Sequence, residues 1–492
     1  MYSGKRFRFP FALSLALSVS SLSIAPVAHA QRHDNPDPTD VTTSNSGSTA
    51  RDPGVRAGSV NAGQPLSTLS PSQLQFFQDG LNRFVQIDSV SGAAPGEPGK
   101  GLGPGFNSNS CASCHAQPTV GGTSPSANAY PFVGQNPQTT VGYDYGAANQ
   151  VPFFITADGP VREARFPYSV NSNGSVNTQV ADGGVHDVFS IAGRGDATGC
   201  TMPQPNFAQM QRQNNLIFRI PTPTFGAGLI ENIADATIVA NMQANSQAKS
   251  ALGISGHPNY SGNDGSITRF GWKAQNKSLE IFAGEAYNVE MGVTNELFQT
   301  KRANPPASCL YNPTPEDQTN FDSSGAAVTS DVVAFAMFSR FLAPPAPSAQ
   351  GISNNPSTHS IQNGQAMFSA IGCTMCHTPS LQTAGSTFTA ALSKQPANLY
   401  SDLLVHHMGS GLADNISQGA AGGDEFRTAP LWGVGQRVFF LHDGRSGPNN
   451  GGLVHAIQQH QSQGSEANRV ISLYNRLSPQ AQQDLLNFLR SL

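Results

Sequence analysis

Two short motifs contain the residues in this chain that have the clearest chemical use. Each has the pattern Cys-x-x-Cys-His. Two thiols one helical turn apart can form thioethers with the vinyl groups of a porphyrin, and the adjoining histidine can ligate its iron. The candidate cofactor-binding residues are Cys111, Cys114, His115, Cys373, Cys376 and His377. The two motifs therefore predict two covalently bound haem c groups, with His115 and His377 as iron ligands.

Zinc binding and thiol–disulfide exchange are the alternative uses of such motifs. A structural zinc ion needs about four ligands in a closed site, and these two motifs lie far apart in the sequence. A histidine follows each cysteine pair directly, which favours haem attachment over both alternatives.

The iron of each haem also needs a group, or an open position, on the face opposite the motif histidine. Histidine and methionine side chains crowd into residues 406–460, after the second motif. They are His406, His407, Met408, His442, His455 and His460. At least one of these should ligate iron. In the first part of the chain the candidates are scattered and none is favoured; they are His186, His257, Met202 and Met291.

The remaining cysteines, Cys200 and Cys309, have no metal-like spacing. A disulfide between them would close a loop of about a hundred residues and contribute on the order of 4 kcal/mol to stability. Two free buried thiols are the alternative.

The elements that must position these residues are mostly helices joined by long loops. The chain has 492 residues, of which only 12% are charged, with 50 Gly and 35 Pro. This composition predicts a mostly α, loop-rich protein of two domains. The net charge of -4 gives no sign of nucleic-acid binding.

The first thirty residues resemble an export signal. Basic Lys5, Arg6 and Arg8 precede an apolar run, and Ala28-His29-Ala30 precedes Gln31. The run is too short and too rich in serine for a spanning helix, so we expect a cleaved signal peptide at 1–30 and no stable membrane insertion. In a bacterium the mature protein would be periplasmic.

The rest of the chain divides by composition. We expect a disordered leader at 31–69, an N-terminal haem c domain at 70–343, a proline-rich linker at 344–360 and a C-terminal cytochrome c domain at 361–492. Capping signals predict helices that begin at Ser70-Pro71 and at Ser478-Pro479.

A weak internal echo indicates duplication. Gly80 and Phe84 are spaced like Gly364 and Phe368, and each pair precedes a Cys-x-x-Cys-His motif. The distance to the motif is longer in the first copy, so we expect two cytochrome c-like domains of which the first is enlarged by insertions.

Longer stretches around the motifs resemble the di-haem oxidoreductase family, whose distant relatives include bacterial di-haem cytochrome c peroxidases. The matching stretches are 101–107, 118–122, 159–163, 219–231, 270–274, 400–404, 408–409, 427–433 and 441–445. The family is sometimes labelled a thiol oxidoreductase, but here haem attachment would consume the motif thiols.

The resemblance implies a reaction and roles for particular residues. The N-terminal haem would react with peroxide, and the C-terminal haem would receive electrons from a small redox protein. Glu231, next to a run of small residues, is the candidate acid–base group for O–O cleavage; a structural carboxylate is the equal alternative. Alignment with relatives favours His460 over Met408 as the second ligand of the C-terminal iron, and Trp432 is either a relay between the haems or a core residue. A bridging calcium ion is implied in the same way.

Two other functions remain open at this point. A pure electron carrier would have both irons six-coordinate. An oxidase would act on an organic or protein substrate. An open iron position distinguishes the enzymes from the carrier.

Overall fold

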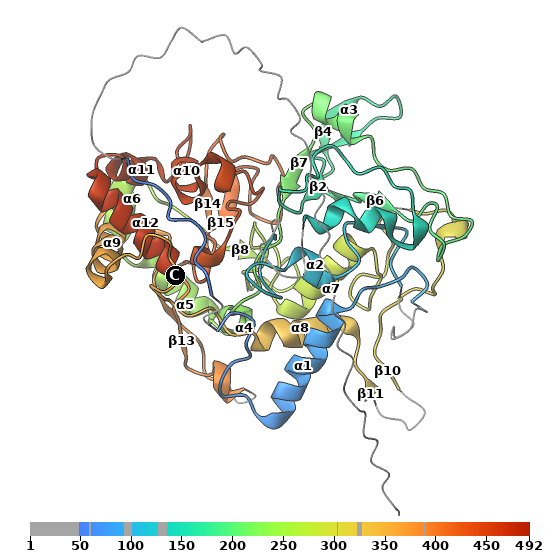
Figure 1. Ribbon diagram of the computed structural model, residues 1–492, viewed down its shortest axis with the longest axis horizontal. Helices are drawn as coiled ribbons and strands as arrows, with labels where there is room; N and C mark the ends of the chain where they lie inside the picture. Colours follow the sequence, from blue (N-terminus) through green and yellow to red (C-terminus); the bar gives the residue numbers. More distant parts are fainter. Residues whose placement is uncertain are drawn as a thin grey trace, which may run out of the picture. The chain divides into compact units, whose positions relative to one another are not determined.

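The computed structural model describes residues 49–58, 61–92, 101–125, 135–302, 304–321, 327–386 and 389–492. Helices and long loops dominate these residues, and the strands form only small sheets of two or three strands (Figure 1). The mostly helical, loop-rich fold class is therefore confirmed. The expected signal peptide at 1–30 lies outside the described residues. No helix in the described part of the chain is long and apolar enough to cross a membrane.

The first helix begins where its capping signals predict. Helix α1 (Pro71–Val85) has Ser70 as its N-cap, and the side chains of Ser70 and Gln73 complete a capping box. Its buried face packs on α8 (Asp331–Phe341), where the rings of Phe84 and Phe338 lie 4.8 Å apart. Gly80 permits this close packing, because a Cβ there would lie 2.3 Å from the carbonyl oxygen of Ala334.

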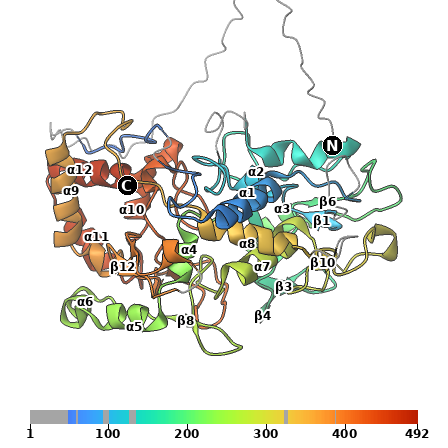
Figure 2. The ribbon, with the colours of Figure 1, turned by 90° about the horizontal axis from the view of Figure 1, so that it is seen from below.

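The C-terminal part repeats this arrangement. Helix α9 (Thr358–Ala370) packs on α12 (Pro479–Ser491), as Figure 2 shows. The rings of Phe368 and Phe488 lie 5.5 Å apart, and a Cβ on Gly364 would lie 1.9 Å from the carbonyl oxygen of Asp484. The internal echo is thus a shared packing motif: in each half a helix glycine contacts a second helix.

The phenylalanine of each echo contacts the histidine of the motif that follows it. The ring centroids of Phe84 and His115 are 5.8 Å apart, and those of Phe368 and His377 are 6.0 Å apart. In both halves the helix pair therefore packs against the motif histidine.

The other α-helices have four to nine residues, except α7, which has 13. They are α2 (Cys111–Cys114), α3 (Phe207–Arg212), α4 (Ala227–Glu231), α5 (Asp235–Gln243), α6 (Ser246–Leu252), α7 (Leu279–Met291), α10 (Gly452–Gln458) and α11 (Asn468–Tyr474).

The sheets are antiparallel throughout the described residues. In the three-stranded sheet, β2 (Glu163–Arg165) lies between β5 (Val185–His186) and β7 (Ile217–Arg219). The paired strands are β1 (Gly105–Phe106) with β6 (Phe189–Ser190), β3 (Tyr168–Val170) with β4 (Val176–Ala181), β8 (Asn259–Tyr260) with β9 (Ile267–Thr268), β10 (Asn320–Phe321) with β11 (Ala327–Val328), β12 (Leu381–Gln382) with β13 (Pro396–Ala397), and β14 (Val405–His407) with β15 (Glu425–Arg427).

Residues on the two sides of the expected 344–360 linker share one core. Ile230 and Ile238 belong to the same buried cluster as Leu399 and Leu404. Ser48–Leu492 accordingly forms one compact unit, and α9 begins within the expected linker.

Part of the expected disordered leader at 31–69 is packed against the C-terminal part. Asp52 pairs with Arg490 of α12 at 2.7 Å, and the backbone N–H of Arg56 donates to the carbonyl of Gly435 at 2.8 Å. The described residues between 49 and 69 therefore differ from the expectation, because polar contacts with distant residues hold a segment that has little apolar surface.

Of the two alternatives left open for the remaining cysteines, the structure shows the disulfide. Cys200 and Cys309 are bonded, and the bridge belongs to the core cluster of the N-terminal part.

Candidate functional sites

The first motif lies at the wall of a cavity. Helix α2 starts after Ser110, whose side chain accepts a hydrogen bond from the backbone N–H of Ser113 at 3.2 Å. Both cysteines and His115 line a cavity with Glu163 and Glu290. The Nδ1–H of His115 donates to the carbonyl of Gly122 at 3.0 Å, so its lone pair is on Nε2. Burial lowers the pKa of His115 to about 4, which keeps the ring neutral and able to bind a metal.

The histidine of the second motif is oriented and kept neutral in the same way. Cys373, Cys376 and His377 line a separate cavity. The Nδ1–H of His377 donates to the carbonyl of Tyr400 at 2.9 Å, and burial lowers its pKa to about 4. A backbone acceptor that orients a ligating imidazole is the usual partner of a metal-bound histidine.

The motif cysteines are not disulfide-bonded. Burial raises the pKa of the thiols of Cys114 and Cys373 to about 12. Thiol exchange needs a thiolate, which such a thiol does not form near neutral pH. The structure therefore argues against a redox dithiol at either motif.

The second cavity also contains both predicted opposite-face ligands, His460 and Met408. His460 is ready to ligate, since its Nδ1–H donates to the carbonyl of Ala456 at 2.8 Å and burial lowers its pKa. Of the other crowded histidines, His442 lines the same cavity and stacks on Phe426 with ring centroids 4.2 Å apart.

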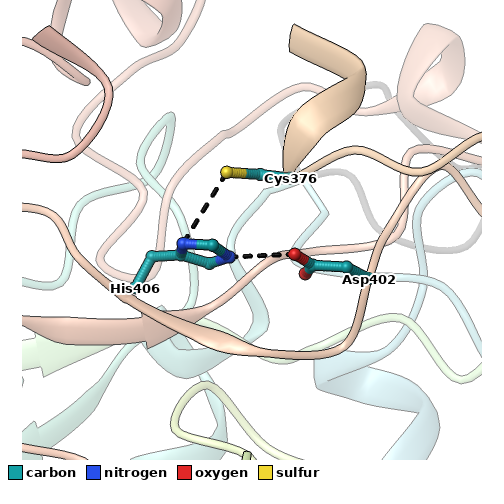
Figure 3. A group of neighbouring side chains, drawn as sticks. All are labelled: Cys376, Asp402 and His406. Carbon is teal, nitrogen blue, oxygen red and sulfur yellow. Dashed lines mark hydrogen bonds and ion pairs between the residues drawn. The ribbon is translucent and has the colours of Figure 1, made fainter. Parts of the chain in front are cut away.

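His406 is engaged at both ring nitrogens. Its Nε2 lies 3.0 Å from Asp402 Oδ2 and its Nδ1 lies 2.7 Å from Glu466 Oε2. Figure 3 shows the ring between Asp402 and Cys376, whose sulfur is 3.7 Å from Nδ1. Burial alone would lower the pKa of His406, but Cys376 and Asp402 raise it well above its usual value. Carboxylates hold both ring nitrogens, so His406 has no free nitrogen to offer an iron.

Cys376, Asp402 and His406 also lie close enough together to hold a metal ion. A thioether bond at Cys376 would remove the thiolate that such an ion needs. Haem attachment and a metal in this cluster are therefore exclusive uses of Cys376.

The N-terminal cavity carries a pair of carboxyl groups that sequence reasoning did not select. Glu163 of β2 and Glu290 of α7 line the cavity and share a hydrogen bond. Burial and the neighbouring Glu163 raise the pKa of Glu290 well above its usual value. Burial would also raise the pKa of Glu163, but its ion pair with Arg165 lowers it. At neutral pH one group is thus a carboxylic acid and the other a carboxylate, which suits proton donation and acceptance.

Glu231 is not in this cavity. Its carboxylate accepts from Arg340 Nε at 2.6 Å and from the backbone N–H of Leu279 at 2.8 Å, and it lines neither motif cavity. Glu231 thus links the end of α4 to the start of α7 and the end of α8, which favours the structural alternative.

Trp432 belongs to a buried core cluster, which is one of its two expected roles, and the other tryptophan lies at the motif cavities. Trp272 lines both motif cavities, and its Nε1–H donates to the carbonyl of Ile220 at 2.8 Å. Trp432 lines neither; it packs on Gly226 beside a smaller cavity between the two. Of the two tryptophans, Trp272 is therefore the one that lines both motif cavities.

Two buried arginines test whether the second cavity fits a haem. Arg427 and Arg437 line it, and burial lowers the pKa of each to about 10. Among the described residues, Nη1 of Arg427 and Nε and Nη2 of Arg437 have no hydrogen-bond partner. A buried guanidinium group needs a negatively charged partner. The two carboxylates of a haem are suitable partners for these two arginines. The donor set and the buried charges therefore fit a haem.

No curated protein matches this chain. A solved structure titled "Kuenenia stuttgartiensis Hydrazine Synthase Pressurized with 20 bar Xenon" is 13% identical, with a TM-score of 0.31, over 93% of this chain and 100% of that chain. A "MauG-like protein associated with microbial copper homeostasis" is 15% identical, with a TM-score of 0.25, over 55% of this chain and 89% of that chain. At these scores neither likeness bears on the fold.

The family model described as "Di-haem oxidoreductase, putative peroxidase" matches residues 177–492, which is more than half of the chain and includes the second motif. A family named for two haems agrees with two separate cavities, each lined by its own Cys-x-x-Cys-His motif. This chain therefore belongs to the di-haem oxidoreductase family.

Proposed function

We propose that this protein is an exported di-haem c-type peroxidase that reduces peroxide at the N-terminal cavity with electrons received at the C-terminal one. The observation that carries the proposal is the hydrogen-bonded pair of Glu163 and Glu290 in the cavity of His115. The export-like segment at 1–30 supports a periplasmic location.

Haem would be held in each cavity by two thioethers and one imidazole. Cys111, Cys114 and His115 would hold the first, and Cys373, Cys376 and His377 the second. The neutral, backbone-oriented histidines support this assignment. When bound, the haem supplies an iron position for peroxide and the electrons for its reduction.

The carboxyl pair can move the protons that the reaction needs. Reduction of hydrogen peroxide breaks the O–O bond, consumes two electrons and two protons, and releases two waters. Glu163, as the carboxylate, can take the proton of the inner oxygen, and Glu290, as the acid, can protonate the departing outer oxygen. Arg165 beside them stabilises the negative charge that develops as the bond breaks.

A small redox protein would deliver the electrons, one at a time, to the C-terminal site. His460 would complete the coordination of the C-terminal iron, and Trp272 is the residue placed to conduct between the cavities. Its indole N–H bond to Ile220 fixes the ring in one orientation.

An electron carrier without catalysis is the second candidate. Met291 lines the N-terminal cavity, and its sulfur lies 3.9 Å from the sulfur of Cys111. A methionine ligand on the first iron would close the position at which peroxide must bind.

Electron paramagnetic resonance of the haem-loaded protein, followed from oxidised to half reduced and then with hydrogen peroxide, separates the two functions. A high-spin or peroxide-responsive haem is expected. Glu163→Gln should then lower the rate of peroxide reduction by about 10²- to 10⁴-fold, because it removes the proton acceptor.

Glu231→Gln is the matched control, since that carboxylate lies outside the cavity. It should keep the peroxide rate per haem. Two low-spin, peroxide-inert haems in the unmodified protein would exclude the peroxidase and leave the carrier.

A further inference from the structure

Three charged side chains are buried in contact with one another, away from the carboxyl pair of the first cavity. They are Arg219 of β7, Lys273 and Asp414, and each is at most 3% exposed. Arg219 Nη2 lies 2.7 Å from Asp414 Oδ2, and Lys273 Nζ lies 3.1 Å from Asp414 Oδ1. One buried carboxylate therefore holds two buried cations, and we call these three residues the charged row.

Each end of the charged row reaches one of the motif cavities. Arg219 itself lines the cavity of the first motif. At the other end, Lys273 Nζ lies 4.1 Å from the centroid of the Phe426 ring, and Phe426 stacks on His442. Phe426 and His442 both line the cavity of the second motif. Arg219 thus belongs to the wall of the first cavity, and Lys273 packs on the wall of the second.

Hydrogen bonds fix the charge of Lys273. Its Nζ donates to the carbonyl of Gly422 at 2.7 Å and to that of Glu425 at 2.8 Å, as well as to Asp414. Three acceptors use all three N–H groups of an ammonium, and a neutral amine has only two. Burial lowers the pKa of Lys273 to about 8, which leaves the group protonated at neutral pH.

Asp414 is a carboxylate that cannot easily move. Burial would raise its pKa, but Arg219 and Lys273 lower it. The backbone N–H of Ile416 also donates to its Oδ1, at 3.0 Å. Asp414 lines neither motif cavity, so it acts on them only through the two cations that it holds.

Buried charges act strongly on a redox centre because little water screens them. Reduction adds one electron to a ferric haem, so a nearby positive charge favours the reduced form and a negative charge opposes it. A unit charge about 10 Å from a redox centre, at an effective dielectric constant of about 20, changes the equilibrium constant of reduction by roughly tenfold.

We propose that Asp414 is a positioning residue that fixes Arg219 and Lys273 at the two cavity walls, and that the charged row sets the reduction potentials of both haems. Within the row, two cations outweigh one carboxylate and favour the reduced form of each haem. A donor that is only moderately reducing could then deliver electrons. The proposal concerns reduction potentials, so it holds for a peroxidase and for an electron carrier alike.

The test is a spectroelectrochemical titration of the haem-loaded protein at about pH 6, where Lys273 is protonated. Lys273→Met and Arg219→Met each remove a positive charge, so each should lower both potentials. The expected change is about tenfold in the equilibrium constant of reduction, which is about 59 mV for a one-electron couple. Asp414→Asn removes a negative charge and should raise both potentials by a similar amount. A loss of packing alone would not reverse the sign between these variants.

The two methionine variants carry the test if Asp414→Asn does not fold. Each of them leaves one cation paired with Asp414, whereas Asp414→Asn leaves two buried cations without a counter-charge. Arg219→Lys keeps the charge and should have potentials close to those of the unmodified protein. The absorption spectrum of the oxidised protein verifies that each variant holds its haems.

Lys277→Met is the matched control, because Lys277 pairs with Asp264 and the two side chains are 41% and 47% exposed. Water screens such a pair, so both potentials should stay unchanged. The proposal would be overturned by unchanged potentials in Lys273→Met and Arg219→Met, by a response of one haem only, or by shifts of the same sign in Lys273→Met and Asp414→Asn.

Discussion

At the scale of single residues, the two motif histidines and His460 are oriented for metal binding in the same way. In each, Nδ1 donates to a backbone carbonyl, at 3.0 Å for His115, 2.9 Å for His377 and 2.8 Å for His460. A fixed tautomer lowers the cost of binding iron because the lone pair is already on Nε2. His406, two residues from Met408, is not oriented to bind iron, since carboxylates engage both of its ring nitrogens.

This difference predicts the ligand of the C-terminal iron. His460→Met should raise the reduction potential of that haem, by a part of the roughly 0.8 V range that axial ligands span, because a thioether stabilises reduced iron. Met408→Leu should leave the potential nearly unchanged. A spectroelectrochemical titration of both variants decides between them, and the reverse result would assign Met408 as the ligand.

At the scale of elements, the same packing of two helices occurs twice. α1 on α8 and α9 on α12 each bring a helix glycine against backbone of the partner helix, and each sets a phenylalanine against the motif histidine. The spacing of glycine and phenylalanine is therefore a requirement of the helix pair. It survives in both halves although the distance to the motif differs.

A methyl group at either glycine should disturb the packing. Gly364→Ala and Gly80→Ala place a Cβ 1.9 Å and 2.3 Å from a carbonyl oxygen, and each should cost about 1–3 kcal/mol of unfolding free energy. Gly262→Ala is the control, because no atom lies within 4 Å of its added Cβ. Urea unfolding measures the three variants, and equal stability of Gly364→Ala and Gly262→Ala would contradict the packing argument.

At the scale of the whole molecule, contacts between distant parts of the chain hold residues 48–492 as one unit. The pairing of Ile233 with Thr383 and of His257 with Val405 ties the middle of the chain to the C-terminal part. The ion pair of Asp52 and Arg490 ties residues near the described N-terminal end to the last helix. Unfolding of one cavity region should therefore disturb the other.

The disulfide between Cys200 and Cys309 is a covalent link between distant parts of the chain. It joins residues 109 positions apart, so replacing Cys200 and Cys309 together by serine should lower the unfolding free energy by about 2–5 kcal/mol. The thermal midpoint of the haem-loaded variant measures the effect. An unchanged midpoint would mean that the loop is already restrained in the unfolded chain.

Local patterns in the sequence were enough for much of this description. The Cys-x-x-Cys-His spacing and the helix caps at Ser70 and Ser478 act within a few residues of one another. Such features depend only on residues that are close together along the chain, so they can be recognised from the sequence alone. The family resemblance was also readable at this level, whereas the sequence allowed a disulfide between Cys200 and Cys309 without deciding it.

Only the tertiary structure decided which groups meet. Glu163 on β2 and Glu290 on α7 meet because two distant elements pack around one cavity, and the same packing makes Trp272, not Trp432, the tryptophan that lines both motif cavities. It also turns Glu231 away to Arg340. The types of these residues are plain in the sequence, but their pKa values and partners arise from burial and from contacts between elements far apart in the chain.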